Sequence, residues 1–358
     1  MAKIFFLLSG EFESLSFAEL KAILEVEGYA YTVTEKLDLT ARIEADVESV
    51  KQVHRRSGYT RVCALELFTC LASNNAITKA ANAVDLKTVL GEGATFEVRI
   101  RRIKEYSTKD ATMALESLLG KLILQNVKHA KVNLTKPDKT FFGILTNGKL
   151  VFGLKLAEVQ PKPFVERRPR KKPFFHPSAM NSKLARCMIN LAHARENAYL
   201  LDPFCGTGTT MIEATLIGVR AIGIDVQRRM AEGAKRNMEH FGLNAEAIVI
   251  ADARKLPLTH VSCVVTDPPY GRSATTLKSN TKAIVEGILT SARELLSKGQ
   301  RICIALPIRV NRLRQNSAGA LSKEIDPYAS ALGYRKLESH LAYCHNTLTR
   351  EVVVYQKE

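Results

Sequence analysis

The C-terminal half of the chain alternates short apolar runs with amphipathic segments. Strands are expected at Tyr199–Asp202, Arg220–Asp225, Ala247–Ala251, Val261–Asp267 and Arg301–Leu306, with helices from about Thr209, over 227–241 and over 282–298. This alternation predicts βα units and an α/β fold with a parallel, doubly wound sheet. The last two apolar runs, Tyr334–Tyr343 and Leu348–Gln356, have only a short connection between them. We therefore expect them to add an antiparallel hairpin to that sheet.

The N-terminal half has the mixed pattern of small α+β units. Strands are expected at Lys3–Leu8, within 29–44 and at Tyr59–Cys70, and Phe96–Arg101 alternates apolar with charged side chains. The segment from Ser16 to Glu19 is a capping box that predicts a helix through about Glu27. Further helices are expected over 46–54, near 74–84 and over Lys109–Leu124, followed by strands at Lys131–Leu134, Phe141–Leu145 and Lys149–Leu156. An Asn147-Gly148 turn joins the last two strands.

A basic, proline-rich segment separates the two halves. Residues 161–177 contain five prolines and no helical periodicity, which predicts a semi-rigid, extended linker. Six Lys and Arg side chains lie within 161–172, and the whole chain has a formal net charge of +16. An excess of this size favours a polyanionic partner such as nucleic acid, because phosphate contacts supply most of the sequence-independent affinity for it.

Composition excludes several other classes of protein. No apolar run reaches the roughly 18 residues of a membrane span, and the apolar stretch at the N-terminus is too short for a signal peptide. The seven cysteines form no CxxC pair and the eight histidines show no ligand spacing, so we expect neither a disulfide framework nor a metal site. A cytoplasmic protein without a membrane partner is the resulting expectation.

The first chemical motif is a glycine loop between an expected strand and helix. It comprises Asp202, Pro203, Phe204, Cys205, Gly206, Thr207 and Gly208, and Asp225 ends the next strand nineteen residues after Gly206. Glycines let a ligand approach the backbone, and an acid at that position can bond ribose hydroxyls. A third fingerprint glycine is absent, because Met211 stands there, and so is a phosphate loop. This pattern favours an adenosine-type cofactor without a pyrophosphate.

The second motif, Asp267-Pro268-Pro269-Tyr270, directly follows the apolar strand at 261–266. Ligands of open α/β sheets bind at this end of the strands. The carboxylate of Asp267 and the carbonyl of Pro268 are two acceptors for a planar amino group, and Tyr270 can stack on a base. A mere turn is the alternative interpretation, since consecutive prolines are common in loops.

Together these residues resemble the class I methyltransferase fold, with S-adenosyl-L-methionine as cofactor. The Asp-Pro-Pro-Tyr motif is similar to that of enzymes that methylate exocyclic amines of bases. The resemblance implies that Asp202, Phe204, Cys205, Gly206, Thr207 and Gly208 hold the methionine part, Asp225 the ribose, and Asp252 with Ala253 the adenine. It also implies that the segment around Pro177 and Ser178 closes over the cofactor. Asp267, Pro268 and Tyr270 are the expected catalytic residues.

The N-terminal half resembles a THUMP domain, an RNA-binding module of tRNA-modifying enzymes. The order of elements from Gly120 through the hairpin at 141–156 carries this resemblance, and the ferredoxin-like unit that usually precedes such a domain fits residues 1–55. The expected domains are therefore a ferredoxin-like domain (1–55), a THUMP domain (56–157), a basic linker (158–172) and a methyltransferase domain (173–358). The cations expected to contact RNA are Arg99, Arg101, Arg167, Arg168, Arg170, Lys171 and Lys172.

The combination resembles the archaeal-type THUMP-containing tRNA (guanine(10)-N(2))-methyltransferases over nearly the whole chain. This implies transfer of one or two methyl groups to the 2-amino group of a guanosine in tRNA, with no activating subunit required. Asp267 would draw the amine toward tetrahedral geometry and take its proton. The base would be extruded to stack on Tyr270.

Three other functions are weighed against this one. A guanosine in the acceptor stem is the first alternative, because other THUMP methyltransferases act there. A DNA amino-methyltransferase is disfavoured because no sequence-reading insertion follows Tyr270, so DNA is not an expected partner. A non-catalytic RNA-binding protein is disfavoured because Gly206, Asp225 and Asp267 are all intact. We also expect a fragment of residues 173–358 to bind cofactor and to lose tRNA methylation.

Overall fold

The computed structural model describes residues 1–104, 109–269, 280–308, 320–345 and 348–358. Its internal packing divides the chain into two units. The N-terminal unit comprises Met1–Glu13, Gly28–His54 and Thr60–Val159, and the C-terminal unit comprises Ser14–Glu27, Arg55–Tyr59 and Gln160–Glu358. Two short segments from the first sixty residues therefore pack within the C-terminal unit.

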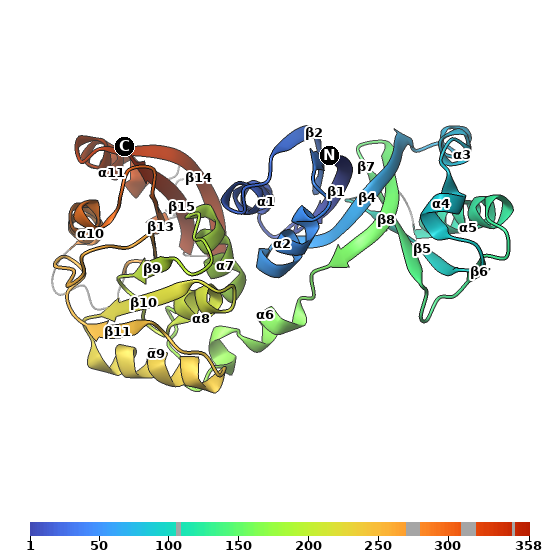
Figure 1. Ribbon diagram of the computed structural model, residues 1–358. Coiled ribbons are helices and arrows are strands. Elements are labelled where there is room, and N and C mark those ends of the chain that lie inside the picture. Colours follow the sequence, from blue (N-terminus) through green and yellow to red (C-terminus); the bar gives the residue numbers. More distant parts are fainter. Residues whose placement is uncertain (105–108, 270–279, 309–319, 346–347) are drawn as a thin grey trace. The chain divides into compact units, whose positions relative to one another are not determined.

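The N-terminal unit is built on one eight-stranded sheet in the order β2-β3-β1-β4-β8-β7-β5-β6. Its strands are β1 (Ala2–Leu8), β2 (Tyr31–Leu37), β3 (Thr40–Ala45), β4 (Thr60–Leu71), β5 (Thr95–Arg102), β6 (Lys131–Val132), β7 (Lys139–Thr146) and β8 (Lys149–Glu158). Its helices are α2 (Ser49–Arg56), α3 (Asn74–Asn82), α4 (Leu86–Leu90) and α5 (Lys109–Asn126). The helices α3, α4 and α5 gather beside β5 in Figure 1 and enclose a core around the rings of Phe96, Phe141 and Phe152.

The C-terminal unit contains a seven-stranded sheet in the order β11-β10-β9-β12-β13-β15-β14. Its strands are β9 (Tyr199–Asp202), β10 (Arg220–Asp225), β11 (Ala247–Ile250), β12 (Cys263–Thr266), β13 (Arg301–Ile308), β14 (Tyr334–His345) and β15 (Leu348–Lys357). Its helices are α1 (Glu13–Val26), α6 (Lys162–Glu166), α7 (Ser182–Leu191), α8 (Thr209–Thr215), α9 (Arg228–His240), α10 (Thr281–Leu295) and α11 (Leu321–Ala331), with a 3-10 turn at Pro169–Lys171.

The strand directions confirm the expected architecture. Strands β9 to β13 are parallel, and β15 pairs antiparallel with both β13 and β14. The predicted doubly wound sheet with an antiparallel C-terminal hairpin is therefore correct. After β9 the chain turns to β10 on one side, and it later returns to β12 on the other side of β9. Strand order reverses between β9 and β12, and ligands bind at such a switch point.

The proline-rich segment is not the extended linker that we predicted. It forms the short helix α6 and the 3-10 turn, in both of which prolines occupy the first positions. A proline is tolerated there because the N–H that it lacks has no partner within the helix. The helix α11 was not predicted either, since Pro327 within it interrupts the helical pattern.

Helix α1 is held in the C-terminal unit by a buried polar network. The Glu19 carboxylate is fully buried and accepts bonds from the Ser57 hydroxyl, the Gly58 and Tyr59 amides and the Asn190 side chain at 2.7–3.2 Å. Desolvation by this burial raises the pKa of Glu19. Because each donor satisfies the buried carboxylate, the network specifies how α1, segment 55–59 and α7 fit together.

Arg56 makes a second set of contacts in the same place. Its fully buried guanidinium donates to Asn190 Oδ1 at 3.1 Å, to Glu27 Oε1 at 2.7 Å and to the Ala194 carbonyl at 2.6 Å. Without these partners a buried guanidinium would be costly. The residues before the proline-rich segment thus supply part of the core of the C-terminal unit.

Two absences hold for the part of the chain that the structure describes. No helix there is long and apolar enough to cross a membrane. In the same residues, no group of three or more His, Cys, Asp and Glu side chains is arranged to hold a metal ion.

Candidate active site

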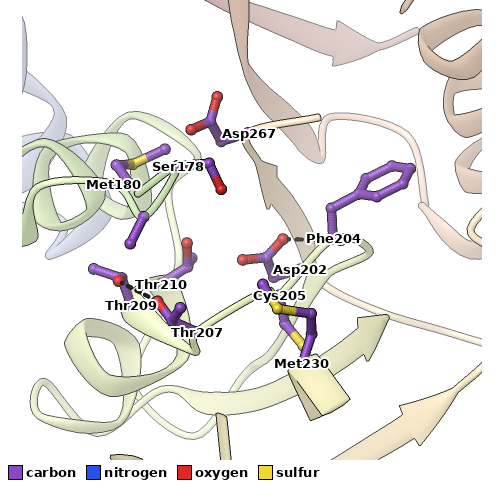
Figure 2. A pocket seen from close by; sticks show the side chains of 12 residues that line it. Ser178, Met180, Asp202, Phe204, Cys205, Thr207, Thr209, Thr210, Met230 and Asp267 are labelled. Carbon is purple, nitrogen blue, oxygen red and sulfur yellow. Dashed lines mark hydrogen bonds between the residues drawn. The ribbon is translucent and has the colours of Figure 1, made fainter. Parts of the chain in front are cut away.

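A pocket lies at the switch point between β9 and β12. Figure 2 shows the Asp267 carboxylate on the opposite side of this pocket from Thr207 and Met230. Its lining comes from the segment before α7, the glycine loop, α8, α9 and the residue after β12, and consists of Ser178, Ala179, Met180, Asp202, Phe204, Cys205, Gly206, Thr207, Thr209, Thr210, Met230 and Asp267. The two acidic side chains predicted from separate motifs thus face one pocket.

Asp202, the last residue of β9, supplies a buried carboxylate. Its Oδ1 accepts bonds from the Phe204 amide and the Thr266 hydroxyl, each at 3.2 Å. Burial raises the pKa of Asp202 to about 7, and the nearby charge of Asp267 adds to the rise. A cationic ligand group in the pocket would favour the ionised form of Asp202.

The glycine loop turns sharply between β9 and α8. Gly206 and Gly208 have positive φ angles of 51° and 77°, which L side chains rarely adopt. A Cβ at Gly208 would also lie 3.1 Å from the Ala234 Cβ on α9. Glycine therefore lets this loop pass close to both α9 and the pocket.

Asp225 fixes that loop to the end of β10. Its Oδ2 accepts the Gly206 amide at 3.1 Å and its Oδ1 accepts the Gln227 amide at 2.9 Å. The side chain is mostly buried, and this burial raises its pKa. Asp225 is not among the residues that line the pocket. Its two hydrogen bonds to backbone amides orient the glycine loop.

Asp267 directly follows β12 and forms an ion pair with an arginine from the C-terminal hairpin. Arg350 of β15 donates from Nη2 to Oδ2 at 2.7 Å and from Nε to Oδ2 and Oδ1 at 3.1 and 3.2 Å. The guanidinium is also 2.8 Å from the Cys344 sulfur through Nη1. Arg350 could not be predicted from the sequence, because it lies 83 residues from Asp267 and on a different element.

Comparisons with known proteins identify methyltransferases among the proteins similar to this chain. Residues 169–316 match a family described as "RMKL-like, methyltransferase domain", and residues 98–236 match one described as "DNA methylase". The chain is 36% identical to a tRNA (guanine(10)-N2)-dimethyltransferase of Methanothermobacter thermautotrophicus, over 84% of this chain and 88% of that one. A tRNA (guanine(10)-N2)-dimethyltransferase of Methanocaldococcus jannaschii is 29% identical, over 98% and 99%.

The chain belongs to the tRNA (guanine(10)-N2)-dimethyltransferase family. It is a methyltransferase whose cofactor is S-adenosylmethionine, as its family and its methyltransferase domain imply. The fold has a solved counterpart in TrmN from Thermus thermophilus, with a TM-score of 0.53 and 20% identity over 99% of this chain and 100% of that one. These findings confirm the expected fold, enzyme class and cofactor.

Within this tRNA (guanine(10)-N2)-dimethyltransferase family member, the pocket gathers seven of the predicted site residues. They are Ser178, Asp202, Phe204, Cys205, Gly206, Thr207 and Asp267. Thr210 and Met230 also line it and were not predicted, although Met230 could have been found as the pocket-facing position in the first turn of the helix after Asp225. The roles assigned to all these residues stay predictions.

The remaining predicted site residues lie outside the pocket lining. Pro177 is exposed, Gly208 is packed on α9, and Pro268 is buried beyond Asp267. Asp252 forms a bidentate pair with Arg254, whose hydrogen bonds lower the pKa of Asp252, and Ala253 is buried against Ile284 and Ile288. Tyr270 lies outside the described residues.

The predicted RNA-binding cations fall into two groups. Arg99, Arg101, Arg168, Arg170 and Lys171 are exposed, with Arg99 paired to Glu97 and Lys171 to Glu166. Arg167 instead pairs with the fully buried Glu213 at 2.6 Å, and Lys172 is buried and donates to the Thr209 hydroxyl at 2.5 Å. Burial lowers the pKa of Lys172 to about 8. These two cations support α8 behind the pocket, so we omit them from the RNA-binding surface.

Proposed function

We propose that this protein transfers methyl groups from S-adenosylmethionine to the 2-amino group of guanosine 10 in tRNA. The observation that carries the proposal is the meeting of Asp202 and Asp267 in one pocket at the switch point, in a chain of this family. Relatives named for guanine 10 and dimethylation support position 10 and two successive transfers to the same nitrogen.

The residues of the pocket fit the cofactor. Asp202 offers a buried carboxylate that gains from a cationic neighbour, which suits an α-ammonium group. Thr207, Thr209 and Thr210 add hydroxyl groups, while Met230 and Phe204 add apolar surface for the carbon chain and the base of the cofactor. Asp225 would bond ribose hydroxyls beside the loop that it fixes, and Ala253 would contact the adenine.

When bound, S-adenosylmethionine supplies an electrophilic methyl group. The protein's part is to hold the guanine amine in line with that group, since alignment is worth many orders of magnitude in rate. Asp267 accepts a hydrogen bond from the amine and localises its lone pair, which conjugation with the ring otherwise disperses. The amine nitrogen gains the methyl and loses one proton, for which Asp267 is the adjacent acceptor. Pro268 would add its carbonyl as a second acceptor and Tyr270 a stacking surface.

The N-terminal unit would supply the choice of nucleoside. Asp267 and its neighbours recognise an amine and a ring face, which every guanosine offers. We propose that residues 1–55 and 56–157 form the ferredoxin-like and THUMP domains, apart from Ser14–Glu27 and Arg55–Tyr59, which pack in the C-terminal unit with the methyltransferase domain of residues 173–358. Arg99 and Arg101 of the N-terminal unit and Arg168, Arg170 and Lys171 of the C-terminal unit would contact phosphates. The enzyme would act in the cytoplasm, on tRNA rather than DNA and without an activating subunit.

The test is methylation by the pure protein alone. Unmodified tRNA transcript and isotopically labelled S-adenosylmethionine are incubated with it, and the digested nucleosides are analysed by mass spectrometry. We expect N2-methylguanosine first and N2,N2-dimethylguanosine later. Methylated adenosine, methylation of duplex DNA instead of tRNA, or tRNA binding without any transfer would each overturn the proposal.

A further inference from the structure

In the C-terminal unit, the buried side chain of Arg350 is in direct contact with the Asp267 carboxylate. Arg350 lies in β15, paired with Pro307 of β13 on one side and Ala342 of β14 on the other. Its side chain is only 9% exposed, and that of Asp267 is 15% exposed. A side chain from the C-terminal hairpin thus reaches the residue that follows β12.

The contact has the geometry of a strong charge-assisted pair. Two of the three contacts, at 2.7 and 3.1 Å, converge on Oδ2 of Asp267, and the third reaches Oδ1 at 3.2 Å. Paired donors from one planar guanidinium fix the rotation of a carboxylate as well as its position. A lysine could supply the charge but not this fork.

Arg350 is itself held from the hairpin side. Its Nη1 lies 2.8 Å from the sulfur of Cys344 on β14. The guanidinium is therefore fixed between Cys344 and Asp267, and its own freedom is small. An orienting group of this kind is effective because its rotamer is already restricted.

The pair also balances charge in the pocket. Asp202 and Asp267 are close enough that the charge of Asp267 raises the pKa of Asp202. Two acidic side chains around one pocket repel each other, and a buried cation beside Asp267 offsets that repulsion. Arg350 thus makes it less costly for both acids to face the same ligand space.

We propose that Arg350 is a positioning residue for methyl transfer: it sets the orientation of the Asp267 carboxylate that receives the guanine amine. This inference rests on the proposed function of Asp267. Arg350 is not among the residues that line the pocket, and its contact with the pocket is made through Asp267. Its loss should therefore lower kcat and leave cofactor affinity nearly unchanged.

The first experiment compares Arg350→Gln and Arg350→Lys with the wild-type enzyme on tRNA. We expect kcat to fall about 100-fold in Arg350→Gln, the size of effect that a small misplacement of a reacting group produces. Arg350→Lys should recover part of this loss, because it keeps the charge without the fork. The Kd for S-adenosylmethionine should stay within about threefold in both variants, a change worth under 1 kcal/mol.

Glu351→Gln is the matched control. Glu351 is the next residue of β15 and equally buried, but its carboxylate accepts from Ser322 and Ser339 instead. Its variant should keep the wild-type kcat. If Glu351→Gln loses as much activity as Arg350→Gln, disturbance of β15 explains the effect and the inference is wrong.

A double-mutant cycle separates positioning from a general structural role. Asp267→Asn keeps an acceptor oxygen but loses the negative charge that pairs with the Arg350 guanidinium. In that background Arg350→Gln should cost less than about threefold in single-turnover rate, because residues that act as a unit are not additive. A further 100-fold loss would overturn the inference.

The possible outcomes distinguish the two proposals. Wild-type protein that methylates no tRNA refutes the proposed function itself. Active wild-type protein with undiminished kcat in Arg350→Gln refutes only the inference. If Arg350→Gln does not fold, Arg350→Lys replaces it, both alone and in the Asp267→Asn background. Full activity of Arg350→Lys would then also contradict the inference.

Discussion

At the scale of single residues, we assign different roles to three aspartates around one loop. Asp202 ends β9, Asp225 ends β10 and Asp267 follows β12. Their surroundings differ. Asp202 is buried among hydroxyl and amide donors, and Asp225 accepts a hydrogen bond from the Gly206 amide. Asp267 is paired with Arg350. Each difference leads to a separate expectation for a substitution.

Asp267→Ala should abolish methyl transfer while the Kd for the cofactor stays within a few-fold. The carboxylate is assigned to the target amine and not to the cofactor. Single-turnover methylation of tRNA and calorimetry of cofactor binding check the two halves of this prediction. Turnover close to that of the wild type would remove the assignment.

Asp225→Ala should weaken cofactor binding about tenfold to a hundredfold. The ribose hydroxyls lose a charge-assisted acceptor worth roughly 1.5–3 kcal/mol, and the Gly206 amide loses its partner. Asp225→Asn, which keeps an acceptor oxygen, should lose less. Calorimetry that finds the same affinity in Asp225→Ala as in the wild type would refute the ribose role.

Cofactor affinity should depend on pH through Asp202. Burial raises the pKa of Asp202 to about 7 in the free enzyme, so below pH 7 its carboxyl is mostly neutral. A bound ammonium group favours the carboxylate, and binding below pH 7 must therefore release a proton. Affinity should fall up to about tenfold per pH unit below 7 and level off above it.

Calorimetry in two buffers of different ionisation enthalpy measures that released proton directly. At pH 6 we expect close to one proton released per cofactor bound, and Asp202→Asn should release none. Binding with no proton release at pH 6 would show that Asp202 does not pair with a cationic group.

At the scale of elements, the C-terminal unit depends on α1 and segment 55–59. Arg56→Ala removes a fully buried cation that bonds Glu27, Asn190 and the Ala194 carbonyl, and should lower the free energy of unfolding by about 3 kcal/mol. Its neighbour Arg55 is the control. Arg55 pairs with the exposed Glu196, and Arg55→Ala should cost under about 1 kcal/mol. Urea unfolding that finds equal costs for the two would contradict this view.

The same packing revises our expectation for a fragment of residues 173–358. Such a fragment lacks Glu19 and Arg56, and it leaves the polar groups of Asn190 and Ala194 without those partners. We now expect it to fold poorly, so that weak cofactor binding by it would carry no information on tRNA recognition.

Sequence reasoning succeeded where the chemistry is local in the chain. The loop with Gly206 and Gly208 and the motif at Asp267 each combine an apolar strand with the polar residues that follow, so their position at the strand ends could be predicted. Arg350 and Arg56 could not be predicted, because their partners lie on distant elements and only packing brings them together. Arg167 and Lys172 were predicted to contact RNA because they belong to a run of cations that the sequence suggests is exposed. Their partners Glu213 and Thr209 lie far along the chain, so only the structure shows these contacts.

At the scale of the whole molecule, the excess of positive charge should act on tRNA rather than on the cofactor. Arg168 and Arg170 are exposed and lie within the C-terminal unit. Arg168→Ala/Arg170→Ala should weaken tRNA binding and lower the slope of log affinity against log salt by about two, since each lost phosphate contact lowers it by about one.

The charge-matched control lies on α9, where Arg228 and Lys235 are paired with Glu232 and Glu239. Arg228→Ala/Lys235→Ala should leave the salt slope near that of the wild type. If Arg168→Ala/Arg170→Ala has the same salt slope as this control, Arg168 and Arg170 do not contact phosphates.

The most direct measurement of the central claim compares two tRNA transcripts that differ only in guanosine or adenosine at position 10. Each is incubated with the pure protein and labelled S-adenosylmethionine, and nucleosides are identified and mapped by mass spectrometry of nuclease fragments. We predict N2-methylguanosine and N2,N2-dimethylguanosine at position 10 of the first transcript and no methylation of the second. Equal methylation of both transcripts, or label at another nucleoside of the first, would contradict the account.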